Sequence, residues 1–539
     1  MASTSTSLIN HNFGGIRRKD SMFSDEKITC SDCQNVELYF TELNSGVGIR
    51  TSKGNQALIN NLIPEHEDVI GMFETTQNGV VYFIVYTETN NLEPNVGKLY
   101  KIDFDNNELV QLNSAALSAT GKCQATEFKQ TNVHVLVFSN GTDLKFIYTN
   151  IEAPSNPLVI AGDTDSVIGS DYRLYVNLED NEGNAVHGLG LVNVFGRLWV
   201  FNGRTLWYSK EGAIGDFNNE EQDTSLTTRA GIIYYSKDIT AIHEYLGALA
   251  VFHNNSSTLL TEDTTTLFKR TDESPGGCAS YNALVFHGTD LFFYDDTKKS
   301  VFSFQQVING DKTLGENIAY DIQNELMLLN KRDLDKIRSL SVVTSDRNEV
   351  WFLVPISSDD NYSIVLIFDY IRGEWIKRKC QHIDSIAVVD SVLYSAGKQV
   401  YKEYTSNDFD GEYIENYYQC TVMNLGTDNT LKITKFPPRI TIDASFKNHF
   451  FVRYVRNYNI TKKPKEKELY SKSFGNVLRY DSGMCYDAGN IYRPNAISGI
   501  IKMPSATFKA LEITFFTNDK DQEFTIKAIE FSRIKVKQI

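Results

Sequence analysis

Two short clusters in this chain have the residue types of a metal site. In the first, Cys30-Ser-Asp-Cys33 forms a CxxC pair, and His11 lies nearby in the sequence. A tetrahedral zinc site needs four ligands, and a second pair at a comparable spacing usually supplies the remaining two. The sequence has no second CxxC pair. We therefore interpret the two thiols as an incidental pair in a loop and expect no metal site there.

The second cluster, Asp103-Phe-Asp105-Asn-Asn107-Glu108, begins like the oxygen-rich loop of a calcium site. Glu108 stands where such a loop requires glycine, and Ser114 stands where it needs a bidentate glutamate. The same residues have the chemistry of a hairpin turn between the apolar segments LYKI and LVQL, because Asn and Asp tolerate a positive φ angle. The sequence therefore predicts a turn here and no cation site.

Familiar catalytic motifs are missing from the sequence. It contains no HExxH, no G-x-S-x-G nucleophile elbow and no G-x-x-x-x-G-K-[ST] phosphate loop. A glycosidase pair stays open, because its two carboxylates need only be near each other in space and the chain has 68 Asp and Glu residues. We expect no catalytic, cofactor-binding or metal-binding residue and predict that the chain is not an enzyme.

Charge and cysteine content narrow the class of protein further. A net charge of −15 argues against a protein that holds nucleic acid by neutralising phosphates. An acidic wall does suit a conduit for DNA, because like charges keep the polymer from adhering.

The seven cysteines are odd in number and scattered along the chain, which indicates reduced thiols. The chain has no apolar run of about eighteen residues, so no membrane span is expected, and we predict synthesis in a cytosol.

Period-two alternation of apolar and polar residues runs along most of the chain and indicates half-buried strands. The 28 Tyr and 32 Phe residues, against 11 Pro, also favour strands. One unit recurs: an apolar strand, a tight turn rich in Gly, Asn or Asp, and a second apolar strand with aromatic residues. Seven copies are found at Gly71–Tyr86, Val133–Tyr148, Leu191–Ser209, His243–Glu262, Asn282–Phe304, Ser341–Pro355 and Asp384–Tyr404.

The spacing of these copies, roughly 40 to 60 residues, is the scale of one four-stranded propeller blade. A small twisted sheet has two apolar faces, and a neighbouring sheet must cover each of them. In the fifth copy, Leu284, Phe286, Leu291 and Phe293 would face adjacent blades, with the hairpin turn at Gly288 to Asp290. A similar turn is expected at Gly141 to Asp143. Two stacked β-sandwiches with coincidental spacing are the alternative.

The predicted fold is therefore all-β. A β-propeller of six to eight blades, with seven favoured, covers residues 61–414 and follows an N-terminal arm and first hairpin at 1–60. Helical spacing of Ile322, Leu326 and Leu329, and of the later Leu334 and Ile337, predicts a short helical insert of one or two helices near 315–339. Longer strands in 415–539 predict a separate β-sandwich-like domain. Between two of these strands, Lys462 to Glu468 is mixed in charge and is expected to be an exposed loop.

Several motifs, taken in their order along the chain, resemble those of the tail nozzle or stabilisation proteins of podovirus-like short-tailed bacteriophages. Residues 12–54 resemble the family's opening, with a strand ending in Gly-Gly at Gly14 and Gly15, then Asn35, Arg50 and Gly54. Residues 195–219 are similar to one of its blades, and the helical insert followed by Val350 and Trp351 is similar to its helix and next blade. The matching blade residues are Arg197, Leu198, Gly203, Ser209, Gly215, Asp216 and Phe217. Muzzle proteins of the crAss-like group are similar in the same way.

The resemblance implies a structural virion protein: a propeller subunit of the tail nozzle that forms the distal DNA-ejection channel and helps retain the packaged genome. It implies a cyclic homo-oligomer, with a hexamer favoured, below portal-proximal adaptor or ring proteins. Tail fibres are a further candidate partner, although the chain is smaller than some nozzle relatives, which leaves their attachment by extra domains open. The expected location is the virion tail, assembled in the bacterial host cytoplasm, and DNA would pass without sequence-specific binding. The alternative is a propeller that binds or cleaves host-surface glycans.

Overall fold

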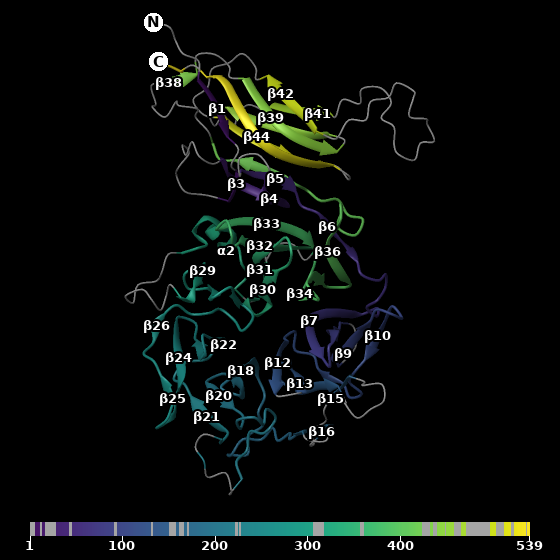
Figure 1. Ribbon diagram of the computed structural model, residues 1–539, viewed down its shortest axis with the longest axis vertical. Coiled ribbons are helices and arrows are strands. Elements are labelled where there is room, and N and C mark those ends of the chain that lie inside the picture. Colours follow the sequence, from purple (N-terminus) through teal and green to yellow (C-terminus); the bar gives the residue numbers. More distant parts are fainter. Residues whose placement is uncertain are drawn as a thin grey trace. The chain divides into compact units, whose positions relative to one another are not determined.

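The computed structural model consists mostly of β-strands, as the sequence predicts, and it divides into two compact units (Figure 1). One unit comprises Ala57–Val365 and Gln381–Glu403, and the other comprises Met1–Gln56, Leu366–Cys380 and Tyr404–Ile539. The structure describes residues 6–10, 13–16, 28–41, 46–90, 94–130, 133–149, 158–160, 166–169, 172–220, 225, 228–305, 317–331, 333–355, 361–422, 432–434, 439–447, 449–456, 465–470, 496–502, 511–518, 522–534 and 536–538.

Seven small antiparallel sheets follow one another along residues 67–406, and we number them sheets 1 to 7. Sheet 1 consists of β7 (Glu67–Gln77), β8 (Val80–Thr89), β9 (Val96–Asp103), β10 (Glu108–Gln111) and β11 (Leu117–Ser118). Sheet 2 consists of β12 (Gln124–Gln130), β13 (Val133–Ser139), β14 (Leu144–Thr149) and β15 (Leu158–Ile160). Sheet 3 consists of β18 (Leu189–Val194), β19 (Arg197–Asn202), β20 (Thr205–Tyr208) and β21 (Gly231–Tyr234).

Sheet 4 consists of β22 (Ala241–Tyr245), β23 (Ala248–Phe252), β24 (Ser256–Asp263), β25 (Leu267–Arg270) and β26 (Ser274–Pro275). Sheet 5 consists of β27 (Leu284–His287), β28 (Asp290–Asp295) and β29 (Ser300–Ser303). Sheet 6 consists of β30 (Arg338–Val343), β31 (Asn348–Val354), β32 (Tyr362–Asp369) and β33 (Glu374–Gln381). Sheet 7 consists of β34 (Ser385–Val389), β35 (Val392–Ala396), β36 (Val400–Ser406) and the early strand β6 (Gly54–Ala57). A two-stranded ribbon of β16 (Ser166–Gly169) and β17 (Tyr172–Leu174) lies between sheets 2 and 3 in the chain.

The seven repeated sequence units fall in seven different sheets, one unit in each. The predicted turns are confirmed at both positions, because Gly288 has a φ angle of 65° between β27 and β28, and Gly141 has a φ angle of 93° between β13 and β14. The Asn140 side chain closes the latter turn by accepting hydrogen bonds from the backbone N–H groups of Thr142 and Asp143. Short-range turn chemistry therefore sets the register of these hairpins.

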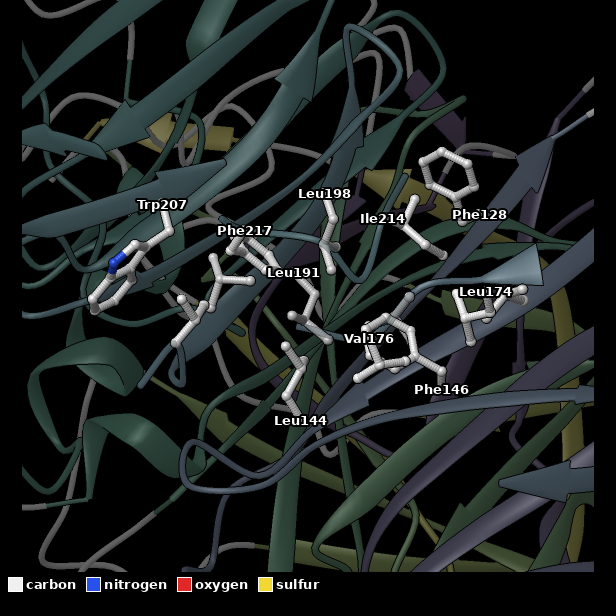
Figure 2. Close-up of a cluster of buried hydrophobic side chains, with 14 of the residues drawn as sticks. Phe128, Leu144, Phe146, Leu174, Val176, Leu191, Leu198, Trp207, Ile214 and Phe217 are labelled. Atoms are coloured by element: carbon white, nitrogen blue, oxygen red, sulfur yellow. The ribbon is translucent and has the colours of Figure 1, made fainter. Parts of the chain in front are cut away.

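Alternate residues of one strand enter different hydrophobic cores. In β13, Val135 and Val137 point into a core shared with sheet 3, whereas Leu136 and Phe138 point into a core shared with sheet 1. Figure 2 shows the first of these cores, in which side chains from sheets 2 and 3 converge. Both faces of sheet 2 are therefore covered by its neighbours, as period-two alternation of apolar residues requires.

Alternate residues of β8 in sheet 1 also enter different cores. One of these cores is shared with sheet 7, the last sheet of the series. Phe83 and Val85 enter a core with Tyr394 and Ala396 of sheet 7, and the rings of Phe83 and Tyr394 have centroids 4.9 Å apart. A backbone hydrogen bond of 2.8 Å from the N–H of Val69 to the carbonyl of Gly397 joins the same two sheets. Sheets that are far apart in sequence are thus neighbours in this unit.

Contacts between the later sheets run in chain order. Sheets 3 and 4 share a core that contains Trp199 and Leu249. Phe252 of sheet 4 contacts Phe293 of sheet 5, with ring centroids 5.1 Å apart. The Ser339 hydroxyl of sheet 6 donates to the carbonyl of Leu284 in sheet 5 at 2.7 Å. Strand β30 of sheet 6 in turn contacts β34 of sheet 7.

The predicted helical insert is present in a shorter form than the sequence pattern indicates. It contains the 3-10 turn η1 (Tyr320–Ile322), the five-residue helix α2 (Gln323–Met327) and the 3-10 turn η2 (Leu334–Lys336). Ile322 and Leu326 are buried, as expected for an apolar helical stripe. The stretch from Arg338 onward belongs to β30.

The other unit contains two six-stranded sheets that combine strands from both ends of the chain, together with Leu366–Cys380, which carries the end of β32 and most of β33. Sheet A consists of β1 (Thr6–Asn10), β4 (Val36–Phe40), β5 (Val47–Thr51), β39 (Arg439–Lys447), β42 (Ala496–Lys502) and β44 (Glu523–Ile534). Sheet B consists of β2 (Phe13–Ile16), β3 (Ile28–Gln34), β37 (Tyr417–Cys420), β40 (His449–Arg456), β41 (Lys465–Tyr470) and β43 (Leu511–Phe516). Two short strands, β38 (Lys432–Thr434) and β45 (Val536–Gln538), pair with each other.

Aromatic side chains join the two sheets of this unit. Phe450 of sheet B contacts Phe446 and Phe524 of sheet A, with ring centroids 5.0 and 5.5 Å apart. Residues 465–468 belong to β41, so the expectation of an exposed loop there is wrong, and residues 462–464 lie outside the described residues. The alternating Lys and Glu residues of KEKELY fit an edge strand, because β41 pairs only with β40 in the described part of sheet B.

Replacing Trp199 with alanine should remove a fully buried side chain from the core between sheets 3 and 4. We expect the free energy of unfolding to fall by about 3–5 kcal/mol, because the indole leaves a cavity and Val194 loses its hydrogen bond from the indole N–H. Denaturant unfolding measures this loss. Tyr234, which is 59% exposed, is the control, and Y234A should change stability by less than about 0.5 kcal/mol. Equal effects of the two substitutions would contradict this packing.

Candidate functional site

Loops that connect several of sheets 1 to 7 converge on a cavity of about 440 Å³ in the unit of Ala57–Val365 and Gln381–Glu403. Sheet 2 contributes Asn140 from its β13–β14 turn, and sheet 3 contributes Asn202 from the end of β19. The segments that lead into sheets 4, 5 and 6 contribute Thr240, Tyr281 and Asp335. A cavity of this size is within the range for a small ligand.

Hydrogen bonds hold the polar groups of this cavity in place. The Thr120 hydroxyl donates to the carbonyl of Asn140 at 2.6 Å, and the Asn140 amide donates to the carbonyl of Ser118 at 2.8 Å. Lys122 forms an ion pair with Asp335, with Nζ and Oδ2 2.5 Å apart. Both partners of this pair are partly exposed, so its contribution to stability is small. The charges that line the cavity therefore balance.

The lining offers no pair of groups for acid–base or nucleophilic catalysis. Among the described residues, the lining contains no His and no Cys, and Asp335 is its one carboxylate, so the two carboxylates of a glycosidase are not brought together there. Burial raises the pKa of the Tyr281 hydroxyl, which keeps the phenol protonated near neutral pH. The described lining therefore offers hydrogen-bonding groups but no second carboxylate, His or Cys to complete a catalytic pair with Asp335.

The CxxC cysteines lie on strand β3, so the expectation that they sit in a loop is wrong. Cys30 lies directly opposite Cys420 of β37, and Cys33 lies opposite Tyr418. All three thiols are buried. Burial, followed by the neighbouring Cys33, raises the pKa of Cys30 well above its ordinary value. Because the thiolate is the metal ligand and the nucleophile, the raised pKa disfavours both roles for Cys30.

No cation site is found among the residues that the structure describes. They contain no group of three or more His, Cys, Asp or Glu side chains arranged to hold a metal ion. His11, the residue nearest to the CxxC pair in the sequence analysis, lies outside the described part of the chain. Within that part, no helix has the length and hydrophobicity needed to span a bilayer.

The calcium-like segment forms the predicted hairpin turn between β9 and β10. One carboxylate oxygen of Asp103 accepts hydrogen bonds from the backbone N–H groups of Asp105 at 3.0 Å and Asn106 at 3.2 Å. Asn107 has a φ angle of 55°, the positive value that the turn requires. Hydrogen bonds, first from the Asn106 side chain, lower the pKa of Asp103. Turn formation therefore accounts for the acidic and amide residues of this segment.

Comparison with known proteins gives no assignment: no protein-family model matches the chain, and no curated protein matches it significantly.

Thiol chemistry provides a test of this core. We expect Cys30, Cys33 and the other described cysteines to react slowly with a thiol reagent in the native protein at pH 8 and rapidly after denaturation, because they are buried. A C485S variant removes the cysteine that lies outside the described residues. Rapid labelling of Cys30 or Cys33 in the folded C485S protein, located by mass spectrometry, would contradict the buried arrangement.

Two buried thiols should also make stability depend on alkaline pH. Burial raises the pKa values of Cys123 and Cys278 to about 12, above the value of about 8.5 for a free thiol. A raised pKa gives stability that is present below about pH 8.5 and is lost as the pH rises towards 12. Denaturant midpoints should therefore fall more steeply over this range in the parent protein than in a C123A/C278A variant. Parallel pH profiles would refute the effect.

Proposed function

We propose that sheets 1 to 7 close into a seven-bladed β-propeller. The observation that supports closure is the core that joins Phe83 and Val85 of sheet 1 to Tyr394 and Ala396 of sheet 7. In addition, the N–H of Leu58, which follows β6, donates to the carbonyl of Val400 in sheet 7 at 2.8 Å. In Figure 1 the labels β7, β12, β18, β22, β30 and β34 follow one another around a common centre. The cavity lined by loops from several sheets fits one mouth of a central channel.

We propose further that the chain is a structural subunit of the tail nozzle of a short-tailed bacteriophage. The residues that carry the sequence resemblance support this proposal, because they occupy tightly constrained positions. A Cβ atom at Gly15 would collide with the carbonyl oxygen of Trp375, and one at Gly54 would collide with that of Asp408. Asn35 has a φ angle of 53°, and its side chain donates to the carbonyl of Glu415 at 3.0 Å.

The second motif of the resemblance is constrained in the same way. Arg197 is fully buried and donates to the carbonyl oxygens of Ser209 and Arg229, each at 2.7 Å. Gly215 has no space for a Cβ atom beside the carbonyl of Tyr175. Asp216 forms an ion pair with Lys210 at 2.8 Å. Substitution of these residues would remove buried hydrogen bonds or create a steric clash, so they are suited to an architectural motif.

In this proposal, copies of the chain form a ring, with a hexamer favoured, below portal-proximal adaptor or ring proteins in the virion tail. A ring makes each interface heterologous, with different faces of neighbouring subunits in contact. The rigid sheets form the wall of the DNA-ejection channel and help retain the genome. The net charge of −15 favours passage of DNA without adhesion, provided that the excess acidic groups line the channel. Glycan cleavage at the cavity of the loops is less well supported, since Asp335 is the one carboxylate among the described residues that line it.

A double-mutant cycle tests propeller closure. Phe83 and Tyr394 should be replaced with leucine singly and together, and the free energy of unfolding measured for all four proteins. If sheets 1 and 7 pack as described, the two aromatic rings should show a coupling energy of about 0.5–1.5 kcal/mol. Tyr234 paired with Tyr394 is the control and should show none. Additive effects of the Phe83 and Tyr394 substitutions would refute closure through this contact.

Electron microscopy tests the nozzle assignment. Purified chain, alone or with the adaptor proteins of the same virion, should form rings with one rotational symmetry and a central channel. Antibody labelling of virions should place the chain at the distal end of the tail. A chain that remains monomeric with its tail partners, or that is missing from tails, would overturn the assignment. A neutral or basic channel wall in the assembled ring would overturn the electrostatic part alone.

A further inference from the structure

The outward face of sheet B carries a second cavity of about 440 Å³, in the unit built from both ends of the chain. Four adjacent strands contribute to it: Asp32 from β3, Tyr417 and Gln419 from β37, Thr514 and Phe516 from β43, and Arg453 from β40. The intervening residues Tyr418, Phe515 and Val452 are buried on the opposite face. Period-two alternation therefore separates a core face from this polar and aromatic face.

Strand register arranges the cavity residues in two rows across the sheet. In the polar row, Asp32 lies opposite Gln419, Gln419 opposite Thr514, and Thr514 opposite Arg453. A parallel row of aromatic side chains lies next to it. Tyr417 lies opposite Phe516, and Phe516 lies opposite Phe451. A flat apolar strip thus runs beside a line of hydrogen-bonding groups.

Ring stacking orders the aromatic row. The rings of Phe451 and Phe516 have centroids 5.2 Å apart and an interplanar angle of 22°. The guanidinium carbon of Arg453 lies 4.8 Å from the Phe516 ring centroid. Both phenylalanine side chains are partly exposed. A ligand with one apolar face and hydroxyl groups around its edge would cover this strip and still reach the polar row.

Two hydrogen-bonding partners fix the carboxylate of Asp32. The Lys377 ammonium donates to Oδ1 at 2.6 Å, and the Tyr417 hydroxyl donates to Oδ2 at 2.7 Å. A carboxylate has about four acceptor sites, so Asp32 retains capacity for hydroxyl donors. Glu415 adds a second carboxylate to the lining, and Arg453 adds a guanidinium. Hydrogen bonds that these carboxylates accept, or that the guanidinium donates, are charge-assisted. They are about twice as strong as hydrogen bonds between neutral groups.

We propose that this face of sheet B binds an oligosaccharide. A pyranose ring has C–H groups on its faces and hydroxyls at its edge, which match the aromatic row and the polar row. The volume suits a few sugar units, whereas a protein partner would need a buried area of about 1,000 Å² or more. Carboxylates are also depleted in the cores of protein interfaces. The inference is independent of propeller closure and of ring assembly.

Binding of defined sugars by the full chain tests the proposal. The probes are arrayed malto-, cello-, chito- and manno-oligosaccharides of increasing length, followed by calorimetry with the best binder. We expect binding by the parent protein and a loss of about tenfold or more in F516A and in R453A, as expected when one stacking or charge-assisted contact is removed. F516Y keeps the ring and should bind within about threefold of the parent protein.

Matched controls distinguish a binding role from a folding role. Y234A removes an exposed aromatic side chain from the other unit and should bind like the parent protein. All variants should keep the parent circular dichroism spectrum. The proposal is overturned if no probe binds at millimolar concentration, or if F516A and R453A bind unchanged. It is also overturned if these substitutions change the sedimentation of the chain but not sugar binding, because the face would then join protein subunits. None of these results depends on where the chain lies in a virion.

Discussion

Burial of both faces of small twisted sheets is the constraint on which the rest of this structure depends. Neighbouring residues of β13 and of β8 enter different cores, so each sheet needs a partner on either side. A linear stack would leave its first and last sheets uncovered on one face. The core between Phe83 of sheet 1 and Tyr394 of sheet 7 buries one face of each of these sheets. In the proposed propeller, this contact closes the ring.

The second unit depends on pairing between distant segments, because its two sheets contain strands from both ends of the chain. Strand β3 pairs with β37, and β5 pairs with β44, so the N-terminal strands are integral parts of these sheets. Cys30 and Cys420 meet in the resulting core. One face of sheet B is buried, and the other presents Tyr417, Phe516 and Arg453. A stable two-sheet core thereby holds a polar and aromatic face in fixed register.

Local signals in the sequence predicted the repeated hairpins well, because turn residues such as Gly288 and Asn107 and period-two alternation act over a few residues. Pairings between distant segments were not predictable in this way. Nothing near Cys30 indicates that Cys420 lies opposite it, so the CxxC pair was wrongly placed in a loop. The rows on sheet B were missed for the same reason, although the alternation of Phe451 and Arg453 with buried Val452 is visible in the sequence.

Native-state hydrogen exchange tests the central claim most directly, because it measures how each sheet opens. If sheets 1 and 7 cover each other, amides of β8 and β35 should exchange with the same opening free energy as those of β13 and β19 in the middle of the series. The unit then opens cooperatively. An open row of sheets would instead fray from its ends, so markedly faster exchange in β8 and β35 than in β13 and β19 would contradict the account.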